Sequence, residues 1–198
     1  ESKFEFRTLV DPTNSNDPRR LPTSPQLKII PAAIDNLVCI LPSQALINTP
    51  VQIFVKGEDK WRNPTPAPSQ LSYRWVGDGQ AIIQNGYLAV DKPCTGYLVI
   101  EAEISTGDIF RCESNPIMFT DKFDGIKHYW GDLHAQTKPT VGTGDEDEYF
   151  AFGRDIARLD FASHQGNDFQ ITDDYWQHLN DISAKYHQDG EFVVFPGY

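Results

Sequence analysis

Hydrophobic and polar residues alternate in several short runs in the first two thirds of the chain. Clear examples are VQIFVKG (51–57), LSYRW (71–75) and YLVIEAEI (97–104). Side chains two positions apart on an extended strand point to the same face, so each run predicts a half-buried strand. Clusters of Gly, Pro, Asp and Asn separate the runs and indicate turns. We therefore expect a β-sandwich over residues 27–120.

The pattern changes at about residue 121, where helical spacing of apolar residues begins. Two segments show this spacing, with apolar positions at Tyr149, Phe152, Ile156 and Leu159 in the first and at Trp176, Leu179, Ile182 and Tyr186 in the second. The acidic run 145–148 and Thr172 are suitable helix starts, and Gly190 is a suitable stop. Short apolar runs flank both segments. This order of strand, helix, strand, helix and strand is typical of a parallel sheet with crossover helices over residues 121–198.

The first 26 residues differ from both regions. They are rich in Pro, Asn, Asp and Arg and contain DPTNSNDPRRLPTSP, which is typical of a loop or an extended segment. We expect residues 1–26 to form an extended arm.

Charge narrows the classes of partner. The 198 residues carry a formal net charge of −11, which repels phosphate backbones and argues against a general nucleic-acid binder. No apolar run reaches the roughly 18 residues of a membrane span, and the N-terminus has no signal-peptide pattern. We expect no membrane contact and a soluble protein of the cytoplasm or periplasm. The three cysteines form no CxxC pair, and a Cys94–Cys112 bridge would need an oxidising compartment.

Candidate chemistry gathers where the expected parallel strands end. The first strand ends in GDLHAQT, with Asp132, His134 and Gln136 at alternating positions. The second ends at His164 and is followed by Asn167 and Asp168. Functional groups of parallel sheets lie at the carboxyl ends of strands, so the two histidines should lie close together. With the nearby oxygens they predict a mixed nitrogen and oxygen site for Zn, Mn or Fe. The other histidines, expected not to bind metal, are His128, His178 and His187.

Four segments together resemble the PHP superfamily, named for polymerase and histidinol phosphatase: YWGDLHAQ, EYFAFGRD, LDFASHQGNDFQIT and FPGY. More narrowly, they resemble a bacterial PHP-like family of poorly defined function with a β-rich region ahead of its barrel. Gly96-Tyr97 and KGEDKWRNP similarly resemble bacterial immunoglobulin-like domains. The PHP resemblance covers about residues 126–198. It implies a distorted (β/α)₇ TIM-like barrel, two or three bound metal ions and hydrolysis, mostly of phosphoesters. For this chain we expect one to three divalent metal ions.

The family motifs map onto single residues of this chain. His134 matches the first His of the HxH motif, and Gln136 stands where the second should be. His164 matches the His of the TDH motif, with Ser163 in place of its Asp. The Glu of the third motif would follow Tyr198. These departures leave open a reduced number of metal ions or a water-orienting role for Gln136.

The expected α/β region is too short to close a barrel. A barrel of this kind needs about 200 to 250 residues. We therefore expect a second polypeptide or a further C-terminal segment to complete it.

The leading hypothesis is a metal-dependent, phosphoesterase-like hydrolase that uses metal-activated water on a small-molecule substrate. The predicted ligands are His134, His164, Asp132 and Asn167. Asp132 is either a ligand or a hydrogen-bond partner of His134, and Asp168 is either a ligand or the general base. One alternative is a metal-dependent hydrolase or lyase with a non-phosphate substrate. The other is a non-catalytic binding or scaffold protein with a degenerate barrel.

Overall fold

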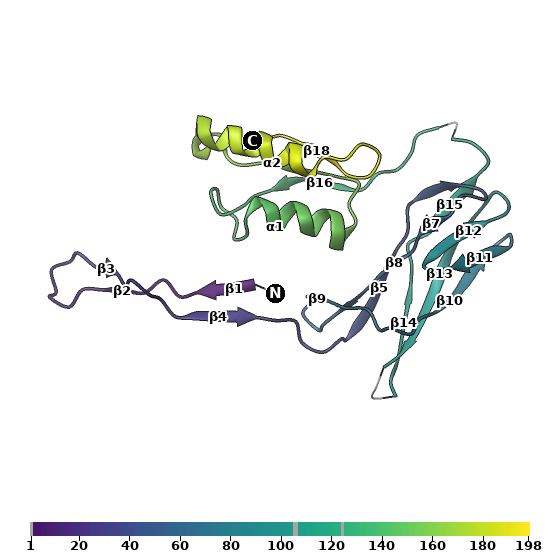
Figure 1. Ribbon diagram of the computed structural model, residues 1–198, viewed down its shortest axis with the longest axis horizontal. Helices are drawn as coiled ribbons and strands as arrows, with labels where there is room; N and C mark the ends of the chain where they lie inside the picture. The colour runs from purple at the N-terminus through teal and green to yellow at the C-terminus, as the bar shows by residue number, and fades with distance from the viewer. Residues whose placement is uncertain (1, 105–106, 124) are drawn as a thin grey trace.

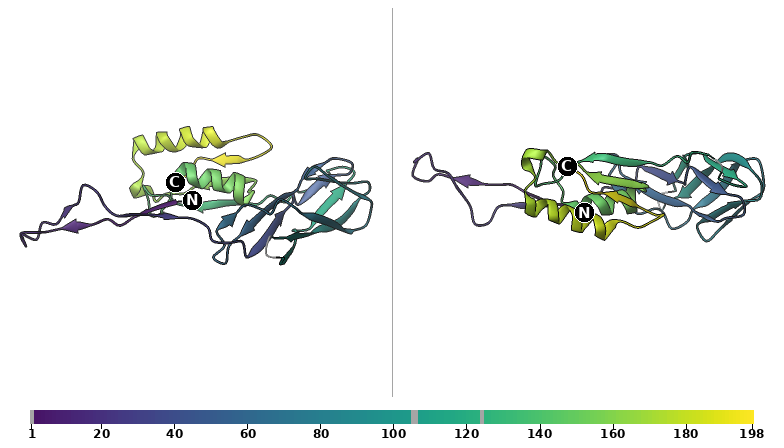
Figure 2. Two further views of the ribbon diagram at one scale, coloured as in Figure 1. Left: turned by 60° about the horizontal axis from the view of Figure 1, so that its bottom comes forward. Right: turned by 90° about the horizontal axis from the view of Figure 1, so that it is seen from above.

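The computed structural model describes residues 2–104, 107–123 and 125–198. Figure 1 shows three parts in chain order, which are a thin N-terminal ribbon, a β-rich body and a C-terminal unit of strands and helices. Figure 2 shows that the ribbon extends to one side and the body to the other, with the C-terminal unit between them. No helix among the described residues is long and apolar enough to cross a membrane.

The N-terminal ribbon is made of two short antiparallel ladders. Strand β1 (Ser2–Glu5) pairs with β4 (Gln26–Ile29), and β2 (Leu9–Val10) pairs with β3 (Arg19–Arg20). At the tip, the carboxylate of Asp11 accepts backbone N–H groups from the following turn, which closes it. We call residues 2–30 the arm.

The body contains strands β5 to β15. Their bounds are β5 (Asn36–Ile40), β6 (Gln44–Leu46), β7 (Val51–Gln52), β8 (Phe54–Glu58), β9 (Pro64–Thr65), β10 (Ser72–Gly77), β11 (Ala81–Gln84), β12 (Tyr87–Val90), β13 (Cys94–Glu103), β14 (Ile109–Glu113) and β15 (Ile117–Thr120). One sheet has the order β10-β13-β15-β6, with β14 also beside β13. The others have the orders β11-β12-β7 and β5-β8-β9.

These sheets share one apolar core. Leu98, Ile100 and Ala102 of β13 are buried, as their alternation predicted, and they join Leu88 and Ile117 in the same cluster. This cluster contains more buried residues than the apolar cluster of the C-terminal unit, and it is therefore the main core of the described chain. The three cysteines are free in the structure.

A buried carboxylate fixes the edge of the body. Asp59 is 1% exposed and accepts hydrogen bonds from the backbone N–H groups of Ala32, Trp61 and Asn63 and from the Asn63 amide. Burial raises the pKa of Asp59, but these donors outweigh burial and lower its pKa to about 2. The carboxylate therefore stays ionised and acts as a hub for the turn.

The C-terminal unit alternates strands and helices. Its elements are β16 (Gly131–Ala135), α1 (Glu146–Ala151), the π-helix η1 (Phe152–Ala157), β17 (Phe161–His164), the 3₁₀-helix η2 (Asp168–Gln170), α2 (Asp173–Tyr186) and β18 (Val193–Phe195). The strands pair in parallel in the order β16-β17-β18. Both α-helices pack on one face of this sheet, around Phe150, Ala162, Ile182 and Val194.

The second helix matches its prediction better than the first. Thr172 caps α2 by accepting the N–H of Tyr175, and the predicted positions Leu179 and Ile182 are buried. The helix ends at Tyr186, before Gly190. In the first helix Phe150 is fully buried whereas the predicted Phe152 is 48% exposed. The winding becomes π-helical at Phe152, so the regular helical spacing behind the prediction does not hold beyond Ala151.

The expected fold class, an immunoglobulin-like sandwich leading into part of a distorted (β/α)₇ barrel, is wrong. The described residues form mostly strands in several small sheets, with two α-helices and no closed barrel. The sheet β16-β17-β18 keeps two open edges, because β16 and β18 each pair only with β17 among the described strands. Local periodicity predicted the alternation of strands and helices in the C-terminal unit, but the assignment of these strands to a (β/α)₇ barrel is wrong.

Among the described residues, two side-chain hydrogen bonds and one cation–π contact join the body to the C-terminal unit. The indole Nε1 of Trp130 donates to Ser43 Oγ at 2.8 Å, and Arg158 Nη2 donates to Gln52 Oε1 at 3.2 Å. The Arg158 guanidinium also lies 5.2 Å from the ring centre of Phe54. Arg158 has a left-handed backbone with φ of 57°, which ends η1.

Candidate functional site

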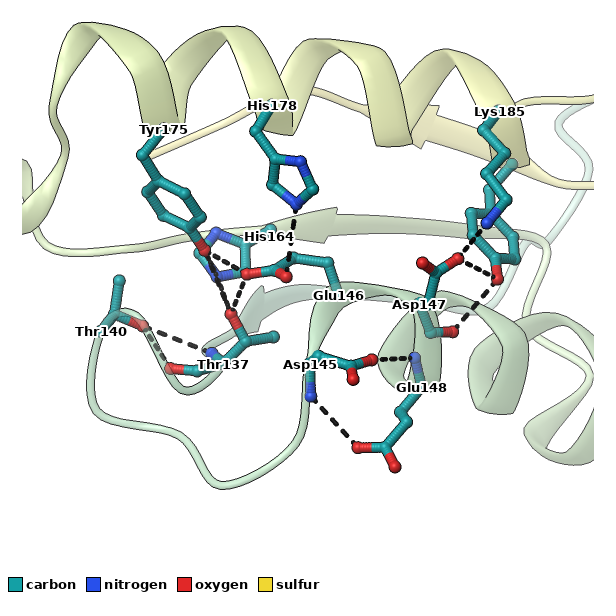
Figure 3. A network of polar contacts seen from close by, with 11 residues as sticks. Thr137, Thr140, Asp145, Glu146, Asp147, Glu148, His164, Tyr175, His178 and Lys185 are labelled. Carbon is teal, nitrogen blue, oxygen red and sulfur yellow. Dashed lines mark hydrogen bonds and ion pairs between the residues drawn. The ribbon is translucent and has the colours of Figure 1, made fainter. Parts of the chain in front are cut away.

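A buried polar cluster lies at the carboxyl ends of β16 and β17, beneath the two helices. We define it as Thr137, Glu146, His164 and Tyr175 (Figure 3). Thr137 follows β16, His164 ends β17, Glu146 is the first residue of α1 and Tyr175 lies in the first turn of α2. Thr137 and His164 are each 1% exposed and Glu146 is 5% exposed. Four elements thus place polar side chains at one point of the interior.

Short hydrogen bonds connect the members of the cluster. The Thr137 hydroxyl donates to Glu146 Oε1 at 2.6 Å, and the Tyr175 hydroxyl donates to the same oxygen. Thr137 Oγ1 lies 3.0 Å from His164 Nε2. At the rim, His178 Nε2 is 3.5 Å from Glu146 Oε2, and its ring stacks on Tyr175.

These contacts define the tautomer of His164. The single hydroxyl proton of Thr137 goes to Glu146, since a carboxylate only accepts. Thr137 Oγ1 then accepts a hydrogen bond from His164, so His164 Nε2 carries the ring proton. Burial lowers the pKa of His164, with a smaller opposing effect of Glu146, so the ring is neutral and Nδ1 holds a lone pair. Among the described residues, that buried Nδ1 has no hydrogen-bond partner.

Hydrogen bonds keep the other two titrating groups in complementary states. Burial raises the pKa of Glu146, but the bonds donated by Thr137 and Tyr175 outweigh it, so the pKa is below its ordinary value. Burial and the neighbouring Glu146 carboxylate raise the pKa of Tyr175. Glu146 is therefore an ionised acceptor and Tyr175 a protonated donor.

Gln136 adds a second unpaired acceptor. Its Oε1 is buried, and the described part of the chain offers it no hydrogen-bond donor. Ala135 pairs with His164 across the two strands, so Gln136 follows directly after the residue opposite His164. A nitrogen lone pair and an amide oxygen at neighbouring strand ends are a chemically suitable start for a cation site.

A β-bulge separates the predicted first-strand residues. The register of β16 against β17 shifts between Asp132 and Ala135, so Ala135 rather than His134 stands opposite His164. His134 is exposed, and its backbone N–H donates to Asp132 Oδ1 at 2.9 Å. The expected alternation of Asp132, His134 and Gln136 on one face is therefore interrupted.

The predicted residues after the second strand lie apart from the cluster's hydrogen bonds. Asn167 donates from Nδ2 to Gln170 Oε1 at 2.7 Å, and Gln170 in turn donates to the Thr140 carbonyl. Asp168 is exposed at the start of η2. These bonds hold the loop after β17 against the loop after β16.

The described residues supply only part of a metal site. Within the described ranges, no group of three or more His, Cys, Asp or Glu side chains is placed to hold an ion. His164 Nδ1 fits a ligand role, because its other ring nitrogen is oriented through Thr137 by a carboxylate, which is how ligating histidines are commonly held. Among the described residues Asp132, His134 and Asp168 form no such group with His164, and the Asn167 amide is bonded to Gln170.

Sequence reasoning missed three members of the cluster. The sequence pattern indicates only a helix-start charge for Glu146, and it does not single out Thr137 or Tyr175. The local signal for Glu146 was present, because a capping box formed by Asp145 and Glu148 already satisfies the helix start and leaves Glu146 available.

Comparison of this chain with known proteins assigns it to no family. No family model and no curated protein matches this chain. Functional inference therefore depends on the geometry of the cluster and on the motifs that surround it.

Proposed function

We propose that this chain belongs to a metal-dependent hydrolase of PHP type, with His164 as a ligand through Nδ1. The single observation that carries the proposal is the buried lone pair of Nδ1, which has no hydrogen-bond partner among the described residues, while Nε2 is held by Thr137, which is itself bonded to Glu146. The motifs around His134 and His164 support the same class by resemblance.

The chain's own residues have distinct tasks in this proposal. Glu146 holds the Thr137 hydroxyl, and Thr137 fixes the His164 ring so that Nδ1 faces the site as a lone pair. Gln136 adds its amide oxygen or orients a water. A bound Zn, Mn or Fe ion would supply a water of lowered pKa and polarise the scissile bond.

Further ligands complete the site in this proposal. Asp132, His134 and Asn167 are the candidates within the chain, and Asp168 is the candidate general base. Because no group of three or more His, Cys, Asp or Glu among the described residues is placed to hold an ion, we propose that a second polypeptide or a further segment brings the candidates together or adds donors. A small phosphoester is the substrate class that the resemblance favours.

Metal titration tests the ligand assignment directly. We expect Zn²⁺ or Mn²⁺ binding to the purified protein by isothermal titration calorimetry, with affinity at least tenfold weaker in His164→Asn. His178→Asn is the matched control, since His178 touches the same Glu146 from an exposed position, and it should bind as the parent does. Gln136→Glu should bind more tightly, because a carboxylate is a stronger ligand than an amide. Equal affinity in the parent and His164→Asn would reject the assignment.

A substrate screen tests the reaction class. The metal-loaded protein, with any chain that co-purifies, is assayed on phosphomonoesters, phosphodiesters, lactones and amides. Turnover of phosphoesters that is lost in His164→Asn supports the proposal. Turnover of lactones or amides alone would favour the alternative, a non-phosphate hydrolase or lyase.

One observation favours a second candidate, a non-catalytic scaffold. The cluster ties the loop after β16, both helices and β17 together, and this alone explains the bonds of Thr137, Glu146 and Tyr175. A scaffold predicts no metal binding by calorimetry and no turnover.

A further inference from the structure

The arm has one apolar and one polar face. Phe4 pairs with Leu27 across the ladder, and Phe6 and Ile29 continue the same face by the alternation of the strands. The rings of Phe4 and Phe6 meet edge to face at 5.0 Å. The opposite face carries Lys3, Glu5, Gln26 and Lys28. Such one-sided patterning is typical of a ribbon that covers another surface.

The apolar face of the arm is only partly covered within the described chain. Phe4, Phe6, Leu27 and Ile29 are 47–56% exposed. Strands β1 to β4 form no ladder with any other described strand. A two-stranded ribbon is at best marginally stable alone in water, so a partner surface would stabilise it.

The C-terminal unit has a complementary bare face. Both α-helices lie on one face of the sheet β16-β17-β18, and the other presents Leu133, Phe161 and Phe195. Leu133 is 52% and Phe195 49% exposed. With Val193 and the body's Pro42 these side chains line a hollow of about 740 Å³. We call Leu133, Phe161, Val193 and Phe195 the bare sheet face.

Charge favours contact between the arm of one copy and the C-terminal unit of another, since residues 121–198 carry six Lys and Arg against 15 Asp and Glu. Residues 1–30 carry five Lys and Arg against four Asp and Glu, whereas residues 31–198 carry 12 against 24. The arm is thus the one weakly basic part of an acidic chain. The acidic residues 31–198 of two copies repel each other, and an exchanged arm places basic residues between them.

We propose that the chain self-associates by arm exchange, with the apolar face of each arm docking on the bare sheet face of a second copy. A two-fold arrangement makes this contact twice and leaves neither surface exposed. The proposal does not depend on the metal site, which lies on the helix-covered face of the sheet.

Sedimentation velocity across a range of concentrations tests the proposal on the full 198-residue chain. We expect a species of twice the 22.4 kDa chain mass. The arm variant Phe4→Ser/Leu27→Ser and the sheet variant Phe195→Ser should each raise the dimer dissociation constant at least tenfold. Ile82→Ser is the matched control, because Ile82 is 67% exposed on the body, away from both surfaces.

The combination of variants identifies the docking site. If the arm docks on the sheet, the arm and sheet substitutions together should weaken the dimer no more than the stronger single change, because both remove one contact. A monomer at every concentration would overturn the proposal, as would a dimer that is insensitive to the arm variant. Additive effects of the two variants would show that the arm docks elsewhere and would overturn it too. Circular dichroism of each variant establishes that these surface changes leave the fold intact.

Discussion

Replacing Thr137 by Val tests the hydrogen-bond relay that orients His164. Valine has nearly the same shape as threonine but lacks the hydroxyl that bonds Glu146 Oε1 at 2.6 Å and His164 Nε2 at 3.0 Å. The substitution leaves the buried Nε2–H without its acceptor and removes one donor from the carboxylate. An unsatisfied buried group costs about 1–3 kcal/mol, and a lost hydrogen bond to a charged group costs about 1.5–3 kcal/mol. These costs overlap, so we expect a loss of about 2–4 kcal/mol.

A loss of that size is large for a small unit. Domains are stable by only about 5–15 kcal/mol, and a unit of this size loses roughly 4–8 °C of melting temperature per kcal/mol. We therefore expect Thr137→Val to lower the melting temperature of the C-terminal unit by about 10 °C or more in calorimetry. Thr137→Ser keeps the hydroxyl and should lose only about 1 kcal/mol for the missing methyl group.

The position of the ring proton of His164 is a second measurement, and a general loss of stability does not change it. In ¹⁵N-histidine NMR spectra, His164 of the parent and of Thr137→Ser should carry its proton on Nε2 with Nδ1 unprotonated. In Thr137→Val that preference should weaken. A valine variant within about 0.5 kcal/mol of the parent, or a parent ring protonated on Nδ1, would refute the relay.

Three further predictions concern the rest of the chain. The pKa of Asp59 is about 2 in the folded state and about 3.9 in the unfolded state. The ionised carboxylate therefore stabilises the fold above pH 4, and this stabilisation is lost as the pH falls towards 2. Asp59→Asn should flatten the acid-unfolding curve between these two pH values. Phe150→Ala should cost about 3–5 kcal/mol and lower only the calorimetric transition of the C-terminal unit, and an equal drop of the body transition would contradict two separate cores. Arg158→Gly should exceed Arg158→Val in unfolding free energy by at least about 1 kcal/mol in urea, because only glycine relieves the left-handed φ of 57° while both lose the guanidinium. Equal values would show that this backbone carries no strain.

Strict periodicity made some elements predictable. In β13 the alternating Leu98, Ile100 and Ala102 follow the pleat, and in α2 the spacing of Leu179 and Ile182 follows the helix. These elements are regular, so the sequence period and the buried face agree.

Irregular backbone made other features unpredictable. The bulge in β16 moves His134 away from the position opposite His164, and no pattern in GDLHAQT signals it. The π-helical segment that begins at Phe152 likewise breaks the regular helical spacing, and Phe152 is half exposed whereas Phe150 of α1 lies in the core. Whether the parallel strands belong to a barrel depends on pairing between distant strands, and local spacing does not specify that pairing. Glu146 joins the cluster only through tertiary contacts with Thr137 and Tyr175.

The placement of the unpaired atoms argues for a ligand at the strand ends. Four buried side-chain atoms in the described chain have no hydrogen-bond partner, and two of them are Gln136 Oε1 and His164 Nδ1 on neighbouring strands. Each such atom costs about 1–3 kcal/mol, which an apolar side chain at either position would avoid. The relay through Thr137 and Glu146 adds to this cost, because it holds the imidazole in the tautomer that leaves Nδ1 bare. A cluster that served stability alone would gain from the opposite arrangement, with both ring nitrogens bonded. A water, a cation or another donor bound at the carboxyl ends of β16 and β17 would offset this cost, and this is the reason that we propose a binding site there rather than a purely structural cluster.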